Sequence, residues 1–464
     1  MCRPLIAAAV LLFLSFTAAF YFVRVNASGN GFHYYGHIPP GSSPELIVVG
    51  FNDDTSVELY DITDPSNPEL LNSTTLNKGR AAVIYVYKAH YKPRYFKVVS
   101  NKRIGVLLTE ITVGSTLYPA ITGGFAGKEF VLMSRMPKYG KYTAVYAYED
   151  AKATLYDEKG NKIMEIEIPQ GKGVNLDLVP KKPYRLVSTG RLLIISMAED
   201  CITYLVDEQG RLKGKHFGGG GFSPPMGGNE IGVVVIPYEA GEVKIYDNNG
   251  KLLASHVFEE AEAELMVPWV VKLGGKPKEF KVVSTGMISV LAGNMDSSGS
   301  FGDDAASIVI PADEKVGLYM PSYAYAAIIA SESTTIAVGG ELRELDEDEH
   351  LLIVVDPSIL DYLNATESSS DIVVLPVGTN ATAVRATRPV TVQVNYLGGW
   401  DNWCTYILAV EDAELSLSPP KPGGEIKEVR IVRGGGGIPF EAVIGGVAGA
   451  AVVAVVLILR KRKT

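Results

Sequence analysis

A short pattern of alternating apolar and polar residues recurs along the middle of the chain. Phe96–Ser100, Tyr184–Ser188 and Phe280–Ser284 are versions of one motif, and Ala383–Thr387 is a weaker fourth copy. A second apolar run follows each copy. Period-two alternation with many β-branched residues is typical of strands that bury one face. The pattern therefore predicts a pair of strands in each of four related units.

A second recurring element lies upstream of the first three copies. Val57–Asp61, Ala153–Asp157 and Val243–Asp247 are runs that end on an acidic residue, and the last two lead into Gly160 and Gly250. Glycine and asparagine adopt the positive φ that tight hairpin turns require. These segments are predicted to be hairpins.

The length of one repeat and the number of predicted strands in it indicate which β architecture the repeat forms. Aligned positions in successive copies are about 90 to 100 residues apart, which is too long for a propeller blade of about 40 to 45 residues. Six strands in one period favour a β-sandwich. We therefore expect four β-sandwich-like units in tandem, at residues 28–125, 126–228, 229–316 and 317–415. The six runs of the first unit are Leu46–Val49, Ser56–Tyr60, Glu69–Thr74, Ala82–Tyr87, Tyr95–Val99 and Ile104–Leu108.

Residues 1–27 have the pattern of a secretory signal. Arg3 is followed by a nearly uncharged stretch up to Val23, and small residues at Val25–Ala27 or Thr17–Ala19 offer a cleavage point. An uncleaved membrane anchor is the alternative, because the apolar run is long for a signal. Both interpretations place the bulk of the chain outside the cell.

The other end has the pattern of a membrane span. Residues 442–459 carry no charge, which is just long enough to cross a hydrocarbon core, and basic residues come directly after them. The expected fold class is thus all-β, with four β-sandwich-like units and one C-terminal transmembrane helix at 439–460. A Pro/Gly-rich spacer at 416–438 precedes it, and 461–464 form a cytoplasmic basic tail. Gly445 and Gly449 suit helix pairing, or they belong to a span that is merely rich in small residues.

Composition narrows the class of partner. The net charge is -9 with a pI near 5.4, and no basic patch offsets it. Phosphate binding needs a surplus of Lys and Arg, so nucleic acid is not an expected partner. Only three glutamines occur among 464 residues, and depletion of thermolabile amides is typical of proteins from hot habitats.

Two cysteines fall in the expected exterior part. Cys201 and Cys404 follow the paired strands of the second and fourth units, and pairing is permitted outside the cell. A disulfide between them and two buried free thiols are both open, because sequence does not provide the Cα separation that a bridge requires.

Exposed sites of modification and metal binding are weaker predictions. Asn72, Asn364 and Asn380 stand in glycosylation sequons. Asp296, Asp303 and Asp304 lie in a Ser/Gly-rich loop and have the oxygen ligands that calcium prefers, as do Asp53 with Asp54 and residues 346–349. A solvated acidic loop is the simpler interpretation. His33 and His37 have a spacing that a metal tolerates, but no nearby residue completes a zinc set.

No pattern in the chain indicates catalysis. We find no Gly-x-Ser-x-Gly elbow, no His-Glu-x-x-His and no phosphate-binding loop, and Gly218–Gly221 are expected to form an interdomain loop. The chain is therefore expected not to be an enzyme and to need no cofactor, with calcium as the one possible ion.

Two resemblances suggest a role. Val283–Asn294 and Thr387–Val392 resemble the recurrent strand of the N-terminal region of IgGFc-binding proteins, which are extracellular adhesive β modules. Together with its ends and low glutamine content, the chain also resembles single-anchored surface proteins of hyperthermophilic archaea, including those associated with S-layers. Both resemblances imply an extracellular structural or adhesive role and identify no binding residue.

The first hypothesis is a membrane-anchored structural or adhesion protein of the cell envelope, either a stalk or an S-layer-associated component. Its partners would be the membrane, other envelope proteins or further copies of itself. The alternative is a receptor-like module for a glycan or an extracellular solute. Tyr396, Trp400 and Trp403 would form its aromatic site, unless they simply pack in the core.

Overall fold

The described part of the chain is all-β, with many short strands and two helices of five residues each. The computed structural model describes residues 31–410, all within the first of the chain's two units at residues 1–420. Within that range, the residues not described are 42, 88–91, 110–116, 123, 134–142, 177, 180–181, 197–201, 208, 221–229, 276–278, 296–304, 321–323, 364–370, 379–380 and 398–403.

The first β unit contains two four-stranded sheets. One has the order β1-β6-β3-β4 and the other β30-β7-β2-β5, and all pairs are antiparallel. The six runs expected from the sequence all fall on strands, β2 to β7. The strand bounds are β1 (Phe32–Ile38), β2 (Glu45–Gly50), β3 (Thr55–Asp61), β4 (Glu69–Leu76), β5 (Ala81–Val86), β6 (Arg94–Ser100), β7 (Ile104–Thr109) and β30 (Cys404–Ile407).

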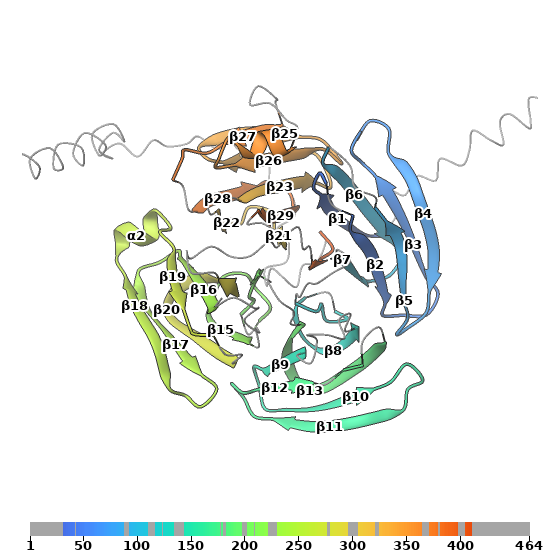
Figure 1. Cartoon of the computed structure of the whole chain (residues 1–464), viewed down its shortest axis with the longest axis vertical. Coiled ribbons are helices and arrows are strands. Elements are labelled where there is room, and N and C mark those ends of the chain that lie inside the picture. The colour runs from blue at the N-terminus through green and yellow to red at the C-terminus, as the bar shows by residue number, and fades with distance from the viewer. Residues whose placement is uncertain are drawn as a thin grey trace, which may run out of the picture. The chain divides into compact units, whose positions relative to one another are not determined.

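The second and third units each form one continuous sheet, of six and seven strands, drawn in green and yellow in Figure 1. The second has β11-β10-β13-β9-β12 with β8 on β13, and the third has β18-β17-β20-β16-β19 with β14 and β15 on β20. Their bounds are β8 (Ala126–Met133), β9 (Thr143–Ala147), β10 (Ala151–Tyr156), β11 (Lys162–Ile168), β12 (Gly173–Leu176), β13 (Pro183–Ser196), β14 (Ile202–Tyr204), β15 (Gly214–Gly220), β16 (Glu230–Pro237), β17 (Gly241–Asp247), β18 (Leu252–Phe258), α2 (Glu260–Glu264), β19 (Trp269–Lys272) and β20 (Glu279–Met295).

The fourth unit again has two sheets, β22-β28-β24-β25 and β21-β29-β23-β26-β27. Its last pair, β26 with β27, is parallel. The bounds are β21 (Ala305–Ile310), β22 (Lys315–Tyr319), β23 (Ala324–Ala330), β24 (Thr334–Val338), β25 (Glu341–Leu345), β26 (His350–Val354), α3 (Ile359–Leu363), β27 (Ile372–Val374), β28 (Ala381–Ala386) and β29 (Val390–Tyr396).

One hydrogen bond at the end of the repeated motif recurs in all four units. The acceptor is a side-chain oxygen of the residue after the motif in the first three copies and of Thr387, the last residue of the fourth copy. The donor is the backbone N–H of the second residue of the neighbouring hairpin. The four donor and acceptor pairs are Ser56 with Asn101, Lys152 with Thr189, Glu242 with Thr285, and Thr335 with Thr387, at 2.9 to 3.0 Å. The repeats inferred from short apolar runs therefore share a specific corner.

The units differ in the path of the chain beyond that corner. In the second and third units the motif and the next apolar run form one continuous strand, β13 or β20, which crosses from one layer to the other. Gly190 and Gly286 stand at the crossing, where a Cβ would lie 2.7 Å from a carbonyl oxygen of the adjacent turn. The first and fourth units have Lys102 and Arg388 at this position, and there the strand is broken.

Each unit receives strands from the segment that follows the preceding unit. Leu117 bridges to Ile195 of the second unit, β14 and β15 pair with β20 of the third, and β21 pairs with β29 of the fourth. β30, from the end of the described chain, pairs with β7 of the first unit. The series therefore closes on itself, with the chain's last described strand completing its first sheet.

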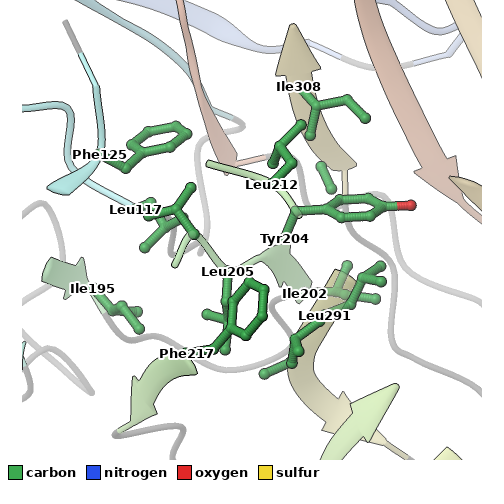
Figure 2. Close-up of a cluster of buried hydrophobic side chains, with 14 of the residues drawn as sticks. Leu117, Phe125, Ile195, Ile202, Tyr204, Leu205, Leu212, Phe217, Leu291 and Ile308 are labelled. Atoms are coloured by element: carbon green, nitrogen blue, oxygen red, sulfur yellow. The ribbon is translucent and has the colours of Figure 1, made fainter. Parts of the chain in front are cut away.

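The strand exchange creates one hydrophobic core that all four units share. A single cluster of buried residues includes Leu107, Phe130, Val233 and Ile328, one from each unit. Figure 2 shows part of it, where side chains from the connecting segments, such as Leu117, Tyr204 and Phe217, pack together. Burial of this kind stabilises by roughly 1.5 to 3 kcal/mol for each large apolar side chain.

Two expectations require correction. The all-β part of the expected fold class is confirmed, but its transmembrane helix is wrong, because no helix among residues 31–410 with their gaps is long and apolar enough to cross a membrane; the segment 439–460 lies outside the described residues. Gly218–Gly220 do not form a loop but belong to β15, where a Cβ on Gly218 would overlap the ring of Tyr146. The expected unit boundaries stay predictions, although β14 and β15 precede the boundary at 228 and pair beyond it.

Candidate functional site: the closing interface

The first and fourth units meet along what we call the closing interface, formed by β1, β6 and β7 on one side and by β23, β26, β29 and β30 on the other. β30 adds to the edge of β7 with Cys404 opposite Thr109 and Ile407 opposite Val106. The pairing continues where the Val410 N–H donates to the His33 carbonyl at 2.9 Å. Ile407 is 1% exposed. This junction joins segments about 300 residues apart in sequence.

Two fully buried residues exchange hydrogen bonds across the interface. The His37 N–H donates to Gln393 Oε1 at 3.0 Å, and Gln393 Nε2 donates to the His37 carbonyl at 2.8 Å. Nε2 also donates to Asn395 Oδ1 at 3.0 Å. Burying an amide without such partners costs several kcal/mol, so this triple arrangement fixes how β29 faces β1.

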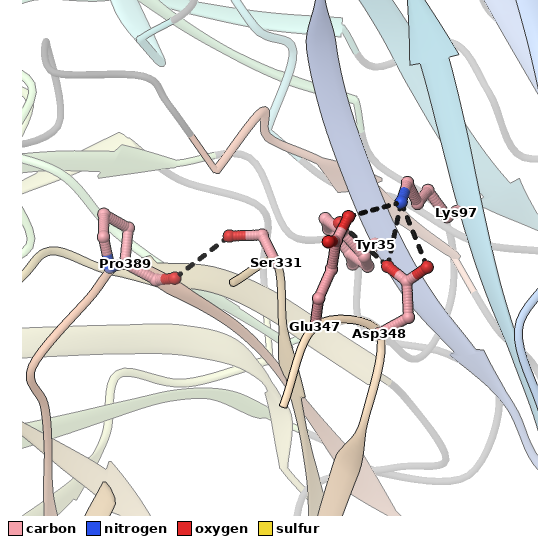
Figure 3. A network of polar contacts seen from close by, with 6 residues as sticks. All are labelled: Tyr35, Lys97, Ser331, Glu347, Asp348 and Pro389. Carbon is pink, nitrogen blue, oxygen red and sulfur yellow. Dashed lines mark hydrogen bonds and ion pairs between the residues drawn. The ribbon is translucent and has the colours of Figure 1, made fainter. Parts of the chain in front are cut away.

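An ion pair lies beside this exchange (Figure 3). Lys97 Nζ lies 2.9 and 3.0 Å from the two carboxylate oxygens of Asp348, and Glu347 approaches at 3.4 Å. The Tyr35 hydroxyl donates to Asp348 at 3.2 Å. The paired side chains are only 12% and 7% exposed, so removal of one partner would leave a charge that water hardly reaches.

Histidine and tyrosine rings fill the rest of the interface. His37 lies between Tyr95 and Tyr325, with ring centroids 4.9 and 5.5 Å away, and Tyr95 stacks on His350 at 3.6 Å. His350 Nε2 lies 3.6 Å from Asp371 Oδ2, and this hydrogen bond lowers the pKa of Asp371 below its usual value. Burial raises the pKa of Tyr95 well above its ordinary range, so its hydroxyl stays protonated.

The side chains of the closing interface join the first unit to the fourth. Its titratable groups are engaged with one another across two units, and no group of three or more His, Cys, Asp or Glu side chains suited to a metal occurs in the described ranges. His33 and His37 lie four residues apart in β1, about 13 Å along an extended strand, so one ion cannot bind both. The arrangement holds two ends of a chain together.

Of the predicted modification sites, the structure describes one in full. Asn72 is exposed in the middle of β4, and its side-chain amide donates to the Ile84 carbonyl. Asn364, Asn380 and Cys201 lie outside the described residues. Cys404 is the first residue of β30, and its side chain is not described. The proposed disulfide stays a prediction.

Most predicted ligand residues lie outside the described residues as well, namely Trp400, Trp403, Asp296, Asp303 and Asp304. The helix-pairing residues Gly445 and Gly449 also lie outside them. Tyr396 is described and is 3% exposed within the shared core, where it is not accessible to a glycan. Among the acidic residues, Asp53 accepts the Lys78 N–H at 3.0 Å, and Asp348 belongs to the closing interface.

Sequence reasoning did not identify the interface residues. Lys97 is part of the first motif copy, but the corresponding positions of the second and third copies are Arg185 and Lys281, and nothing marks Lys97 among these basic residues. Gln393 carried a weak signal, since it is a rare glutamine within an otherwise apolar predicted strand. A buried amide in such a position usually has a specific partner.

Comparisons with known proteins identify no relative. No model of a known protein family matches the chain, and no curated protein matches it. A chain from an archaeal virus with a triple jelly roll fold and turret assembly is 11% identical over 66% of this chain and 86% of its own, with a TM-score of 0.14. A GH2 β-galacturonidase from Eisenbergiella tayi is 10% identical over 47% of this chain and 37% of its own, with a TM-score of 0.12. VP2 of infectious bursal disease virus is 8% identical over 79% and 80%, with a TM-score of 0.11. Scores this low carry no argument about function.

Proposed function

We propose that the chain is a structural or adhesion component of the cell envelope, which works outside the cell by contact with neighbouring molecules. The observation that supports this most is the closing interface, because it ties the last unit to the first through β30 and a buried ion pair. A body closed in this way, with one core cluster to which all four units contribute, keeps its outer strands in fixed positions. Fixed outer surfaces suit repeated lateral contact.

Between the two forms of this role, the pairing favours an array component over a stalk. A stalk gains length when successive units stack end to end and leave both ends free. Here the first and last units pair with each other, so neither end of the series is free to extend. The exposed Asn72 is consistent with a surface that faces the extracellular medium, where glycans are added.

Catalysis and glycan binding receive no specific support from the described residues. The buried polar groups of the closing interface are used to join units, and Tyr396 belongs to the core. We therefore propose a non-enzymatic role in which surface contacts are the activity.

The test is to locate the protein and to remove it. Antibody labelling of cells that make the protein should place it in the envelope, and deletion should disturb envelope order in electron micrographs. Recovery in the cytosol would contradict the proposal. Hydrolysis of a surface polysaccharide by the purified protein, or glycan-array binding that Trp400→Ala abolishes, would replace it with an enzymatic or receptor function.

A further inference from the structure

The four units expose four corresponding outer strands, β4, β11, β18 and β25. Each is the terminal strand of its sheet and pairs only with the other strand of its hairpin among the described strands. Unpaired strand edges attract other strands, and proteins commonly protect them with charged residues. The register aligns the four strands residue by residue, because each ends on a buried apolar residue: Leu76, Ile168, Phe258 and Leu345.

Three of these edges carry charge, and one does not. β11 contains Lys162, Glu165 and Glu167, and β25 contains Glu341, Arg343 and Glu344. β4 begins with Glu69 and presents the sequon at Asn72. β18, with the sequence LLASHVF, has no Asp, Glu, Lys or Arg.

The difference between β11 and β18 falls on equivalent positions. In β11 the charged residues lie opposite Tyr156, Thr154 and Lys152, and in β18 the same register positions hold Leu252, Ser255 and Val257. Leu252 is 48% exposed and Val257 is 56% exposed. The three positions that protect the edge of the second unit are therefore uncharged and partly apolar in the third.

More exposed apolar side chains follow β18 in the chain. Leu265 and Val267, between α2 and β19, are 74% and 41% exposed, and Val270 in β19 is 39% exposed. This segment lies beside β18, since His256 stacks on Trp269 with ring centroids 5.2 Å apart. A stable protein interface buries about 1,200 to 2,000 Å² in total, and apolar residues beside the strand add to what strand pairing alone would bury.

We propose that β18 pairs antiparallel with β18 of a second copy of this chain, related by a two-fold axis. Such a pair brings the residues near the axis against their own copies, so a charge at these positions meets a like charge. β18 is the outer strand without Asp, Glu, Lys or Arg, so no register of the pair sets two such like charges of the strand against each other, while the net charge of -9 opposes contact over the rest of the surface. The proposal deepens the proposed function by naming the neighbour as another copy.

The test measures the mass of the full-length protein in solution by light scattering over a dilution series. The wild type is expected to have twice the monomer mass at micromolar concentration. Leu252→Lys/Val257→Lys should dissociate roughly tenfold or more easily, because like charges across an interface cost several kcal/mol. Within one copy the change is tolerated, since Lys162 already occupies the position equivalent to Leu252 and Glu242 lies opposite Val257.

A matched control adds the same charge to two other edges. Leu70→Lys/Leu342→Lys replaces leucines that are 52% and 45% exposed on β4 and β25, and it should leave the dimer intact. Ser255→Cys gives an independent readout, since a short bis-maleimide should join two copies through this position. A monomeric wild type, or a dimer that survives the β18 variant, would overturn the pairing. Because the assay is in solution, that failure leaves the envelope role to be judged by microscopy.

Discussion

The two middle units and the two terminal units differ in structure at the corner where the repeated motif ends. In the second and third units a glycine lets one strand cross between layers, with Gly286 packed so closely that a Cβ would lie 2.7 Å from the Ala240 carbonyl. In the first unit Lys102 stands at that position and donates to the Asp53 carbonyl at 2.6 Å. In the fourth, Arg388 approaches Glu332 at 3.9 Å.

The difference shows how a repeat diverges at its ends. Where glycine is present the backbone itself connects the two layers, and where a basic residue is present its side chain reaches the same turn from a broken strand. The units with broken strands are also the two that meet at the closing interface. There the ion pair and the Gln393 hydrogen bonds connect parts of the molecule that no continuous strand connects.

The largest effect is expected from breaking the ion pair of the closing interface. Asp348→Asn keeps a residue that tolerates the φ of 66° at this position but leaves Lys97 with only the more distant and more exposed carboxylate of Glu347. We expect a loss of about 3 kcal/mol in the free energy of unfolding, because a buried charge loses its nearest partner. Urea denaturation measures it, and adding Lys97→Met should recover most of the loss.

The control for this variant is an exposed pair with similar backbone geometry. Asp313 also has a positive φ of 62°, and its partner Arg385 lies 3.1 Å away, with the two side chains 58% and 45% exposed. Asp313→Asn should cost no more than about 1 kcal/mol. Equal losses in the two variants would show that the closing interface contributes nothing special.

An intermediate effect is expected at the corner glycine. Gly286→Ala places a Cβ against two carbonyl oxygens, at 2.7 and 2.8 Å, and should lower the free energy of unfolding by about 1 to 3 kcal/mol. Lys102→Ala at the equivalent position of the first unit should change it by less than about 0.5 kcal/mol, as a partly exposed residue without backbone crowding. Equal losses of unfolding free energy in the two variants, measured by thermal unfolding, would contradict the difference between the two corners.

The smallest effect is expected from pH. The hydrogen bond from His350 holds the pKa of Asp371 below its usual value, so this carboxylate stabilises the fold above the pKa it has in the unfolded chain. The contribution is lost as pH falls through the lower folded-state pKa, and for a side chain 42% exposed it is below about 1 kcal/mol. Asp371→Asn should flatten the stability profile below the ordinary aspartate pKa of 3.8 by that amount. An unchanged profile would exclude this contact as a source of acid sensitivity.

Local features were predictable from the sequence, and long-range pairing was not. The alternation of apolar and polar residues located the motif strands and hairpins, because a strand with one buried face has an apolar residue at every second position. β30 has only four residues, and its partner β7 is about 300 residues away, so nothing local identifies the pair. The strands β14 and β15 were missed for the same reason, and the glycines of β15 resemble a loop unless Tyr146 is known to cover them.

The residues that form the closing interface could not be predicted from the sequence either. Its residues come from strands that are adjacent only after the series closes, so Lys97 and Asp348 carry no shared spacing in sequence. The acidic run at 346–349 suggested a calcium ligand set because charge alone does not identify its partner. Burial of one member, Asp348, and the approach of Lys97 decide its role.

A cross-link between paired strands tests the closure most directly. Thr109 lies opposite Cys404 in the β7 and β30 pair, and directly opposed residues have Cα atoms about 4.5 to 5.5 Å apart, within disulfide range. In a Cys201→Ser background, Thr109→Cys should form a disulfide with Cys404, found by mass spectrometry of the digested protein, while Lys102→Cys should not. Absence of that bond under oxidising conditions, in a protein that remains folded, would contradict the closure of the four units.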